Sequence, residues 1–358
     1  MKKGLALVVL VVCAVIFFAS CRQCNKGNAV ETVTKDSTIN AGLDAVNADI
    51  HKDSLNPFLF YKRAHIYEAN GDLKNATTDM FIALTLDSVR PEFYLYAADL
   101  FKKTGETKRG LELMNKAIVT DSMNTGFYVK ASELAYIDTT IPHNYRLALD
   151  YLNAAIDHNP QNADIYFYKG NVFKSIGDTA KAISSFQTAT ELNPKFYNAY
   201  VQLGLLLSKK KDKNAERYLD NAIKVSDKPE DALYAKANIN KEEGLALQDA
   251  NKDAQANDKF NEAIANFKKV VEVNHRNAEA YMGIAFSYYQ IDSVEQAYKF
   301  YGLATQIAPT YAGAYFSKGL CAEDLGKKQE AIMLYQNCLD LDPKFTRAQE
   351  HLKKLQPQ

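Results

Sequence analysis

The feature that most constrains this chain is a spacing of large and small residues that recurs along it. In residues 163–194, a large, a small and a large residue stand at i, i+4 and i+7, on one stripe of a helix; these are Tyr166, Gly170 and Phe173. After a turn at Gly177-Asp178, a small, a large and a small residue follow at the same spacing, and a proline ends the second helix; these are Ala182, Phe186, Ala189 and Pro194. The unit is therefore helix, short turn, helix, turn.

The template recurs with a period of about 34 residues. Its first large residue stands at Phe60, Tyr94, Tyr128, Tyr166, Tyr200, Tyr281 and Tyr315. One further copy, the sixth along the chain, is weaker and has Asn240 at this position. The chain has 22 Tyr and 18 Phe but no Trp, and the repeated aromatic positions account for this surplus.

This unit resembles the tetratricopeptide repeat over residues 57–345. The resemblance implies an all-α fold, an α-solenoid that forms a right-handed superhelix of about eight helix–turn–helix units. Small residues such as Gly170, Gly204 and Gly319 would let paired helices approach closely. We expect an N-terminal capping helix within residues 39–56 and a C-terminal capping helix within 346–358, with His351 on its solvated side.

Three copies depart from the template. The third has a lengthened turn near residues 137–142, and the fifth has a basic turn at Lys209–Lys213. In the sixth, Asn240, Gly244 and Leu247 are followed by about seven extra residues before Ala263, Phe267 and Val270. We expect one helix from Glu230 to about Ala250 there, with Tyr234 as a competing anchor.

The N-terminus has the pattern of a secretion signal. Lys2 and Lys3 precede an apolar run from Leu5 to Ala19, which is short for a membrane span. Ala19 and Ser20 precede Cys21, which resembles the lipobox of bacterial lipoproteins. The resemblance implies a signal peptide at 1–20, lipidation of Cys21 and a flexible tether at 21–38. An uncleaved anchor helix is the alternative. No acidic cluster follows Cys21, so we expect an outer-membrane anchor with the protein in the cell envelope facing the periplasm.

Composition and motifs argue against catalysis. With 43 basic and 43 acidic residues the net charge is zero, which argues against a nucleic-acid partner. The sequence has no paired-His zinc spacing and no glycine-rich phosphate loop, so we expect no catalytic residue, cofactor or metal. Cys21 and Cys24 have redox-motif spacing but lie in the predicted tether. Cys321 and Cys338 are expected to be buried hydrophobes, with a disulfide between them as the alternative.

Several turns carry Asp followed by Ser or Thr and, in most of them, an apolar residue. This resembles an O-glycosylation signal of one group of bacteria, although Asp and Ser are also common helix caps. The candidate acceptors are Ser54, Ser88, Ser122, Thr139, Thr179 and Ser293.

In proteins with such repeats, the first helices line a concave groove. The positions that resemblance assigns to a partner-binding groove are Tyr61, Leu95, Tyr136, Phe167, Asn171, Met282, Phe286, Tyr289 and Phe316. It assigns His65, Glu68, Asp99, Lys102, Glu133, Lys174, Val201, Leu205 and Ser208 to the same face. The cluster of Met282, Phe286, Tyr289 and Phe316 is the richest apolar patch and suits a helix or extended peptide.

The sequence therefore predicts a non-catalytic protein–protein interaction scaffold, anchored by lipid in the bacterial cell envelope. Its partner is expected to be a protein or peptide bound in the groove. The alternatives are a peptide or glycan capture protein, or an accessory subunit of an envelope enzyme or secretion complex.

Overall fold

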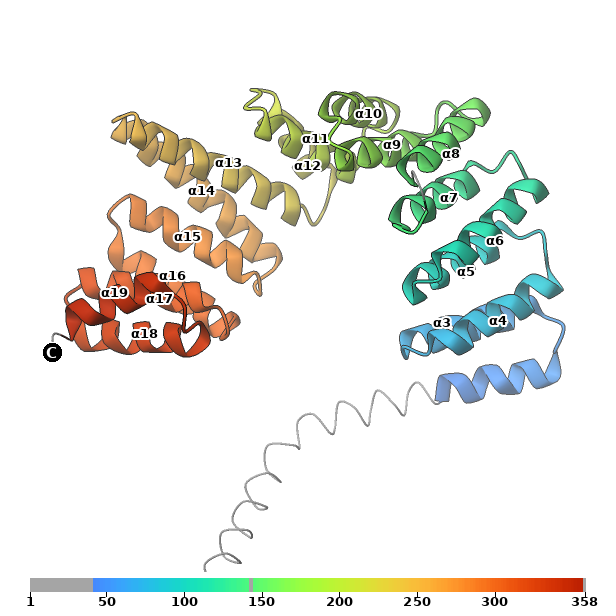
Figure 1. Ribbon diagram of the computed structural model, residues 1–358, viewed down its shortest axis with the longest axis horizontal. Coiled ribbons are helices and arrows are strands. Elements are labelled where there is room, and N and C mark those ends of the chain that lie inside the picture. The colour runs from blue at the N-terminus through green and yellow to red at the C-terminus, as the bar shows by residue number, and fades with distance from the viewer. Residues whose placement is uncertain (1–40, 142–143, 357–358) are drawn as a thin grey trace, which may run out of the picture. The chain divides into compact units, whose positions relative to one another are not determined.

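All regular secondary structure in the described part of the chain is helical. The computed structural model describes residues 41–141 and 144–356 (Figure 1). A helix at residues 41–52 precedes the numbered elements. These are α3 (Pro57–Ala69), α4 (Leu73–Leu86), α5 (Pro91–Thr104), α6 (Thr107–Thr120), α7 (Thr125–Ile137), α8 (Asn144–His158), α9 (Ala163–Ser175), α10 (Thr179–Leu192), α11 (Tyr197–Lys209), α12 (Ala215–Val225), α13 (Glu230–Asp249), α14 (Asp253–Val273), α15 (Ala278–Gln290), α16 (Val294–Ile307), α17 (Ala312–Asp324), α18 (Lys328–Leu341) and α19 (Thr346–Leu355). The predicted all-α fold is confirmed.

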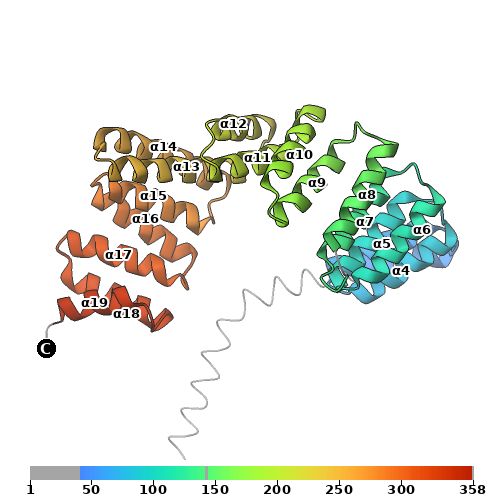
Figure 2. The same ribbon diagram turned by 45° about the horizontal axis from the view of Figure 1, so that its top comes forward.

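The helices pair in sequence as antiparallel hairpins, from α3 with α4 to α17 with α18, and each hairpin packs on the next within its unit (Figure 2). The chain divides into two compact units at Pro160–Gln161. Unit 1 holds the helix at 41–52 and α3 to α8, and unit 2 holds α9 to α19. The division falls inside the range that the sequence predicts as one array. Each unit is a short solenoid of stacked hairpins.

Polar caps and glycines set the hairpin boundaries. Asp72 accepts a hydrogen bond from the backbone N–H of Asn75 at 3.1 Å, and Asp178 accepts one from that of Lys181 at the same distance. Each side chain satisfies a donor that the start of a helix leaves unpaired. Gly177 and Gly326 have φ angles of 82° and 72°, a conformation that glycine adopts without steric cost.

Inside a hairpin, a glycine on the first helix faces a large side chain on the second. A Cβ atom added to Gly170 would lie 2.7 Å from the Phe186 ring, and one added to Gly319 would lie 2.6 Å from the Tyr335 ring. Phe186 and Tyr335 are completely buried. The helices therefore approach each other as closely as the repeated small residues indicate.

The sixth hairpin keeps this packing register, so the predicted insertion between its helices is wrong. Gly244 faces Phe260, with the same spacing as Gly170 and Phe186, and a Cβ on Gly244 would lie 2.9 Å from that ring. The extra residues lie at the opposite end of the hairpin. There α13 has 20 residues where α9 has 13, and α14 has 21 where α10 has 14.

Asn240 occupies the anchor position of this hairpin in place of an aromatic residue. It is completely buried, donates to Glu262 Oε2 at 2.8 Å and accepts from Asn266 Nδ2 at 3.0 Å. Tyr234, the competing anchor, packs against Phe267 with ring centroids 5.6 Å apart. The anchor stripe of α13 therefore holds the polar Asn240 and, seven residues earlier, the buried Leu233, whereas Tyr234 is half-buried and lies one residue off that stripe.

Two further expectations concern the C-terminal end. His351 of α19 does not lie on a solvated face: its Nδ1 is 2.8 Å from Glu323 Oε2, and its ring packs against Tyr335. The imidazole is drawn inward because Glu323 offers it a carboxylate partner. Cys321 and Cys338 are buried free thiols, so the alternative of a disulfide between them does not hold.

The predicted signal peptide, Cys21 and the tether lie outside the described residues, as does part of the lengthened third turn. Among the residues that are described, no helix combines the length and apolar character needed to span a membrane.

Candidate functional site

Two adjoining pockets in unit 2 lie on the predicted binding face. Their volumes are about 480 and 400 Å³. Both pockets are lined by Met282, Phe286, Tyr301, Tyr311 and Ser317. We call the two together the aromatic groove. It runs over α13, α15 and α17 to the start of α19, which are the first helices of successive repeats.

The structure brings together the richest patch predicted from the sequence. Met282, Phe286, Tyr289 and Phe316 all line the second pocket. Phe316 is only 3% exposed, so it forms the floor of that pocket rather than a free surface. It is covered by Arg347, whose guanidinium lies 4.8 Å from the ring centroid. The other three residues are half-buried and form its sides.

Polar groups stand at both ends of the aromatic groove. At the α13 end, Lys241 Nζ donates to Asn238 Oδ1 at 2.8 Å. Tyr234 donates its hydroxyl to Glu279 Oε2 at 3.0 Å. At the α19 end, Arg347 is exposed at the pocket edge. The groove thus combines an aromatic wall with separated polar contacts, as sites that bind peptides do.

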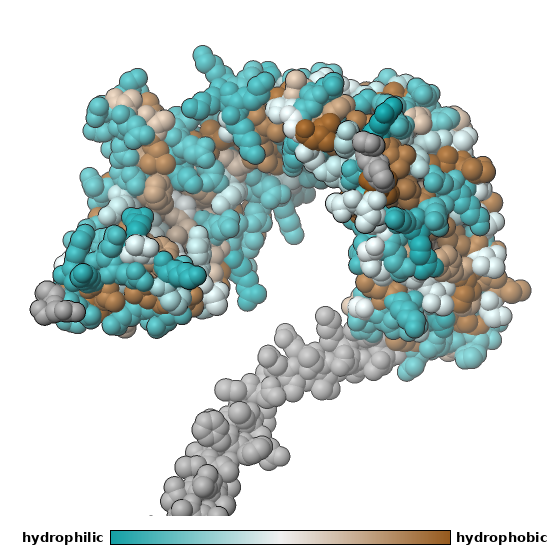
Figure 3. All heavy atoms as spheres, viewed as in Figure 1, coloured by the Kyte–Doolittle hydropathy of each residue, from teal (hydrophilic) through white to brown (hydrophobic). Residues whose placement is uncertain are grey.

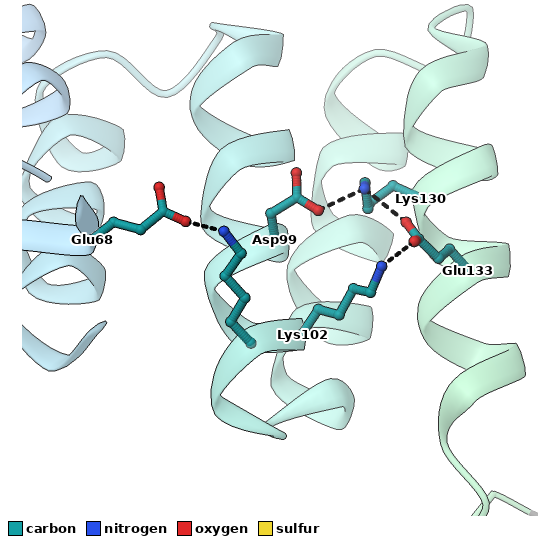
Figure 4. A network of polar contacts seen from close by, with 6 residues as sticks. Glu68, Asp99, Lys102, Lys130 and Glu133 are labelled. Carbon is teal, nitrogen blue, oxygen red and sulfur yellow. Dashed lines mark hydrogen bonds and ion pairs between the residues drawn. The ribbon is translucent and has the colours of Figure 1, made fainter. Parts of the chain in front are cut away.

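In unit 1, ion pairs join neighbouring helices across the corresponding first-helix face (Figure 4). Lys102 of α5 pairs with Glu133 of α7. Lys130 of α7 lies 2.7 Å from both Asp99 and Glu133. Asp99, Lys102 and Glu133, which the sequence placed on a binding face, are therefore already held in ion pairs.

A further ion pair joins α5 to α3, where Lys103 contacts Glu68. Glu68 also accepts a hydrogen bond from the Tyr96 hydroxyl at 2.7 Å. His65 stacks on Tyr96 with centroids 4.0 Å apart, and Tyr61 meets the His65 ring edge-on. Burial lowers the pKa of His65, so this ring is an uncharged packing partner at neutral pH. Tyr61, Leu95 and Tyr136 are half-buried residues of unit 1 and lie outside the aromatic groove.

The middle of the predicted face has another pocket in unit 2, with a volume of about 680 Å³, which shares Tyr234 and Asn238 with the aromatic groove. Phe167, Val201, Leu205 and Ser208 line it. Asn171 is half-buried and is not among the lining residues. Lys174 donates to Gln202 at 2.7 Å, which ties it to the next repeat.

The candidate hydroxyl acceptors fall into two groups. Ser54, Ser88, Ser122 and Thr139 are exposed, whereas Thr179 and Ser293 are half-buried at the starts of α10 and α16. The apolar residues that follow the three serines are Leu55, Val89 and Met123, which are 74%, 71% and 67% exposed. Hydrophobic side chains are visible among hydrophilic ones along the edge of unit 1 in Figure 3. At the equivalent turns of unit 2 the residues are polar: Gln161, Lys195, Arg276, Thr310 and Lys344.

Potential reactive groups in the described residues are held in unreactive settings. Burial raises the pKa of the Cys321 thiol to about 12 and that of Cys338 to about 11. Thiolates are therefore scarce at neutral pH. No group of three or more metal-binding side chains occurs in the part of the chain described. What the arrangement offers is contact surface and polar anchoring.

Lys241, Tyr234, Tyr301 and Tyr311 are groove residues that were not assigned to the groove from the sequence. Lys241 directly follows the anchor Asn240, as Tyr61, Leu95 and Met282 follow the anchors of their repeats, so the tetratricopeptide resemblance would assign it to the groove as well. Tyr311 lies in the turn before α17, where a helix-face pattern does not reach.

Comparison with known proteins agrees with this architecture. Family models of the tetratricopeptide repeat match residues 143–195 and 312–345. The human protein named tetratricopeptide repeat protein 6 is 30% identical over 173 residues, which are 48% of this chain and 31% of that protein. The bovine DnaJ homolog subfamily C member 3 is 24% identical over 210 residues, which are 58% of this chain and 42% of that protein. The chain spans less than half the length of these relatives.

Among solved structures, the C-terminal part of a tetratricopeptide-repeat protein from Cytophaga hutchinsonii has the same fold. The TM-score is 0.54 and the sequence identity 19%, with 72% of this chain and 99% of that chain covered. The predicted tetratricopeptide repeats are thus supported by sequence in two segments and by fold over most of the chain. The lipoprotein features lie outside what these comparisons reach.

Proposed function

We propose that this protein is an interaction scaffold that binds a partner protein or peptide in the aromatic groove of unit 2. The observation that carries the proposal is the contrast between the two units. The unit 1 face is joined by ion pairs across α3, α5 and α7, whereas Met282, Phe286 and Tyr289 line open pockets. Half-buried aromatic side chains of this kind are typical anchors of protein interfaces.

The experiment is crosslinking in the native cell followed by mass spectrometry, with the wild-type chain and a Phe286→Ala/Tyr289→Ala variant. Partners of the groove should be lost from the variant. The matched control is Phe81→Ala, which removes a 41% exposed aromatic side chain from α4 in unit 1. Recovery of the same partners from wild type and groove variant would contradict the proposal.

The same experiment separates the alternatives. A peptide or glycan capture protein would bind isolated peptides or glycans on arrays, with loss of binding in the groove variant. An accessory subunit would instead be crosslinked to one enzyme or secretion complex in a defined ratio. The aromatic wall with Asn238 and Gln290 beside it is compatible with either ligand class.

The proposal places the scaffold in the bacterial cell envelope, held in the outer membrane by lipid on Cys21 and facing the periplasm. Its support is the basic start, the apolar run and the small residues before Cys21. One acyl chain alone binds membranes only marginally, so a stable anchor requires more than one. Metabolic labelling with a fatty acid should mark the wild type and leave Cys21→Ser unlabelled. Labelling of Cys21→Ser would count against this anchor.

We further propose O-glycosylation at the exposed turns of unit 1. In its support, Ser54, Ser88 and Ser122 are exposed and each is followed by an exposed apolar residue where unit 2 has a polar one. An apolar side chain in a solvated turn contributes little to folding, so recognition by a modifying enzyme gives it a role. Intact-mass measurement of the protein from its own cells should show added sugar mass, absent from the triple Ser→Ala variant. Identical excess mass in both would refute it.

A further inference from the structure

A cationic side chain stands at each end of the aromatic groove, and at the α13 end the carboxylate of Glu279 lines the same pocket. Lys241 stands at the α13 end and Arg347 at the α19 end. Within the described residues, neither has a carboxylate at ion-pair distance: Lys241 contacts Asn238, and Arg347 lies over Phe316. This differs from unit 1, where Lys102, Lys103 and Lys130 each pair with a carboxylate.

Lys241 is half-buried, and its surroundings do not supply a full counter-charge. Burial lowers the pKa of its ammonium, and Glu242, its neighbour in sequence, opposes that shift. Glu279, the carboxylate that lines the same pocket, accepts a hydrogen bond from Tyr234 and forms no ion pair with Lys241. A carboxylate brought by a ligand would restore the favourable interactions that this ammonium lacks.

The spacing of the two cations sets the length of the ligand. Lys241 and Arg347 lie on α13 and α19, three first-helix intervals apart along the groove. Successive first helices are separated by at least the spacing of packed helices, about 10 Å, so the cations lie roughly 30 Å or more apart along the groove. An extended chain rises about 3.3 Å per residue, so it covers that distance in roughly nine residues.

We propose that the groove binds an extended acidic segment of a partner protein, with internal carboxylates on Lys241 and Arg347 and apolar side chains between them. This inference rests on the proposed function and specifies the partner's chemistry. The apolar side chains occupy the space between Met282, Phe286 and Tyr289. We assign internal carboxylates because the one side-chain amide in contact with Lys241, that of Asn238, is already engaged. Its oxygen accepts from Lys241, and its nitrogen donates to the Tyr234 carbonyl. A chain-terminal carboxylate requires several converging donors.

The test is selection of a random twelve-residue peptide library, displayed with its C-terminal end fused to the carrier, on the full chain in detergent. The fusion removes every free peptide carboxyl terminus. We expect the selected peptides to be enriched in two acidic positions roughly nine residues apart with aromatic or aliphatic residues between them. Enrichment of neutral or basic peptides, or of none, would overturn the proposal.

Variants then assign the charges. For the selected peptide, Lys241→Gln should weaken binding about tenfold and Arg347→Gln, which is exposed, about threefold. Replacing Glu or Asp of the peptide by the amide should have matching effects that are not additive with the protein variants. Lys353→Gln, an exposed change in the last turn of α19, is the control and should have no effect. Equal affinity of Lys241→Gln and wild type would refute the assignment.

The proposed binding groove and the proposed acidic ligand can be refuted independently of each other. If amide peptides bind as well as acidic ones while Phe286→Ala weakens both, the groove binds partners but not through carboxylates. If crosslinked partners persist in the Phe286→Ala/Tyr289→Ala variant, the groove itself is not the binding site.

Discussion

The close packing of Gly170 against Phe186 gives the sharpest test of the repeat architecture. A Cβ at position 170 would lie 2.7, 2.8 and 2.9 Å from three ring carbons of Phe186, inside ordinary van der Waals contact. The ring is fully buried and cannot swing away into solvent. Overpacking of this kind costs about 1–3 kcal/mol. Replacing a helical glycine by alanine also gains about 1 kcal/mol of helix propensity, which partly hides the clash.

Gly302 separates these two effects. It lies within α16 of the same unit, and a Cβ there would meet only the end of the Lys318 side chain at 3.6 Å. Gly302→Ala should therefore be stabilising, whereas Gly170→Ala should not. The propensity gain cancels in the difference between the variants, which should be about 2 kcal/mol and roughly 4–8 °C in unfolding temperature. Far-ultraviolet circular dichroism on both full-length variants measures this difference. Equal midpoints would refute the packing register.

Three further predictions concern buried polar and reactive groups. Burial opposes ionisation of Glu133, but hydrogen bonds from Lys102 and Lys130 outweigh it and hold its pKa below the ordinary value. Unit 1 should therefore lose stability as pH falls through that lowered pKa, and Glu133→Gln should unfold with a shallower acid dependence; unchanged dependence would contradict this. Cys321 and Cys338 should be alkylated only after unfolding, as mass mapping of labelled peptides would show, and rapid labelling of the folded chain would be inconsistent with their burial. Asn240→Leu should cost about 1 kcal/mol in urea unfolding because it removes the hydrogen bonds of Asn240 with Glu262 and Asn266, and an unaltered midpoint would contradict this.

The helical architecture could be predicted because one local pattern recurs in register. Gly170, Phe186 and their equivalents define both the helix faces and the pairing within a hairpin, so spacing alone identifies them. The groove positions that the tetratricopeptide resemblance assigns include Met282, Phe286 and Tyr289, which form one wall of the aromatic groove. These predictions depend only on contacts within one repeat or between neighbours.

The ion pairs, the position of His351 and the register of the sixth hairpin could not be predicted, because they depend on which side chains come into contact in the folded chain. Glu133 and Lys102 look like free groove residues in the sequence, because the contact between them crosses from one repeat to the next. His351 looks solvated on its own helix, yet Glu323 of α17 holds it inward. The predicted register of the sixth hairpin is wrong because the residues around Phe267 also fit the repeat pattern, whereas Phe260 is the residue that packs against Gly244.

The long sixth hairpin has a consequence for how such arrays change length. Each of its helices is seven residues longer than those of the fourth hairpin, and seven residues are almost two full turns. Side chains that are seven residues apart therefore lie on nearly the same face of the helix, as Tyr234 and Lys241 do on α13. Inserting seven residues into both helices of another hairpin would deepen its groove without rotating the neighbouring repeats. The sixth hairpin can therefore serve as a design template for longer binding surfaces.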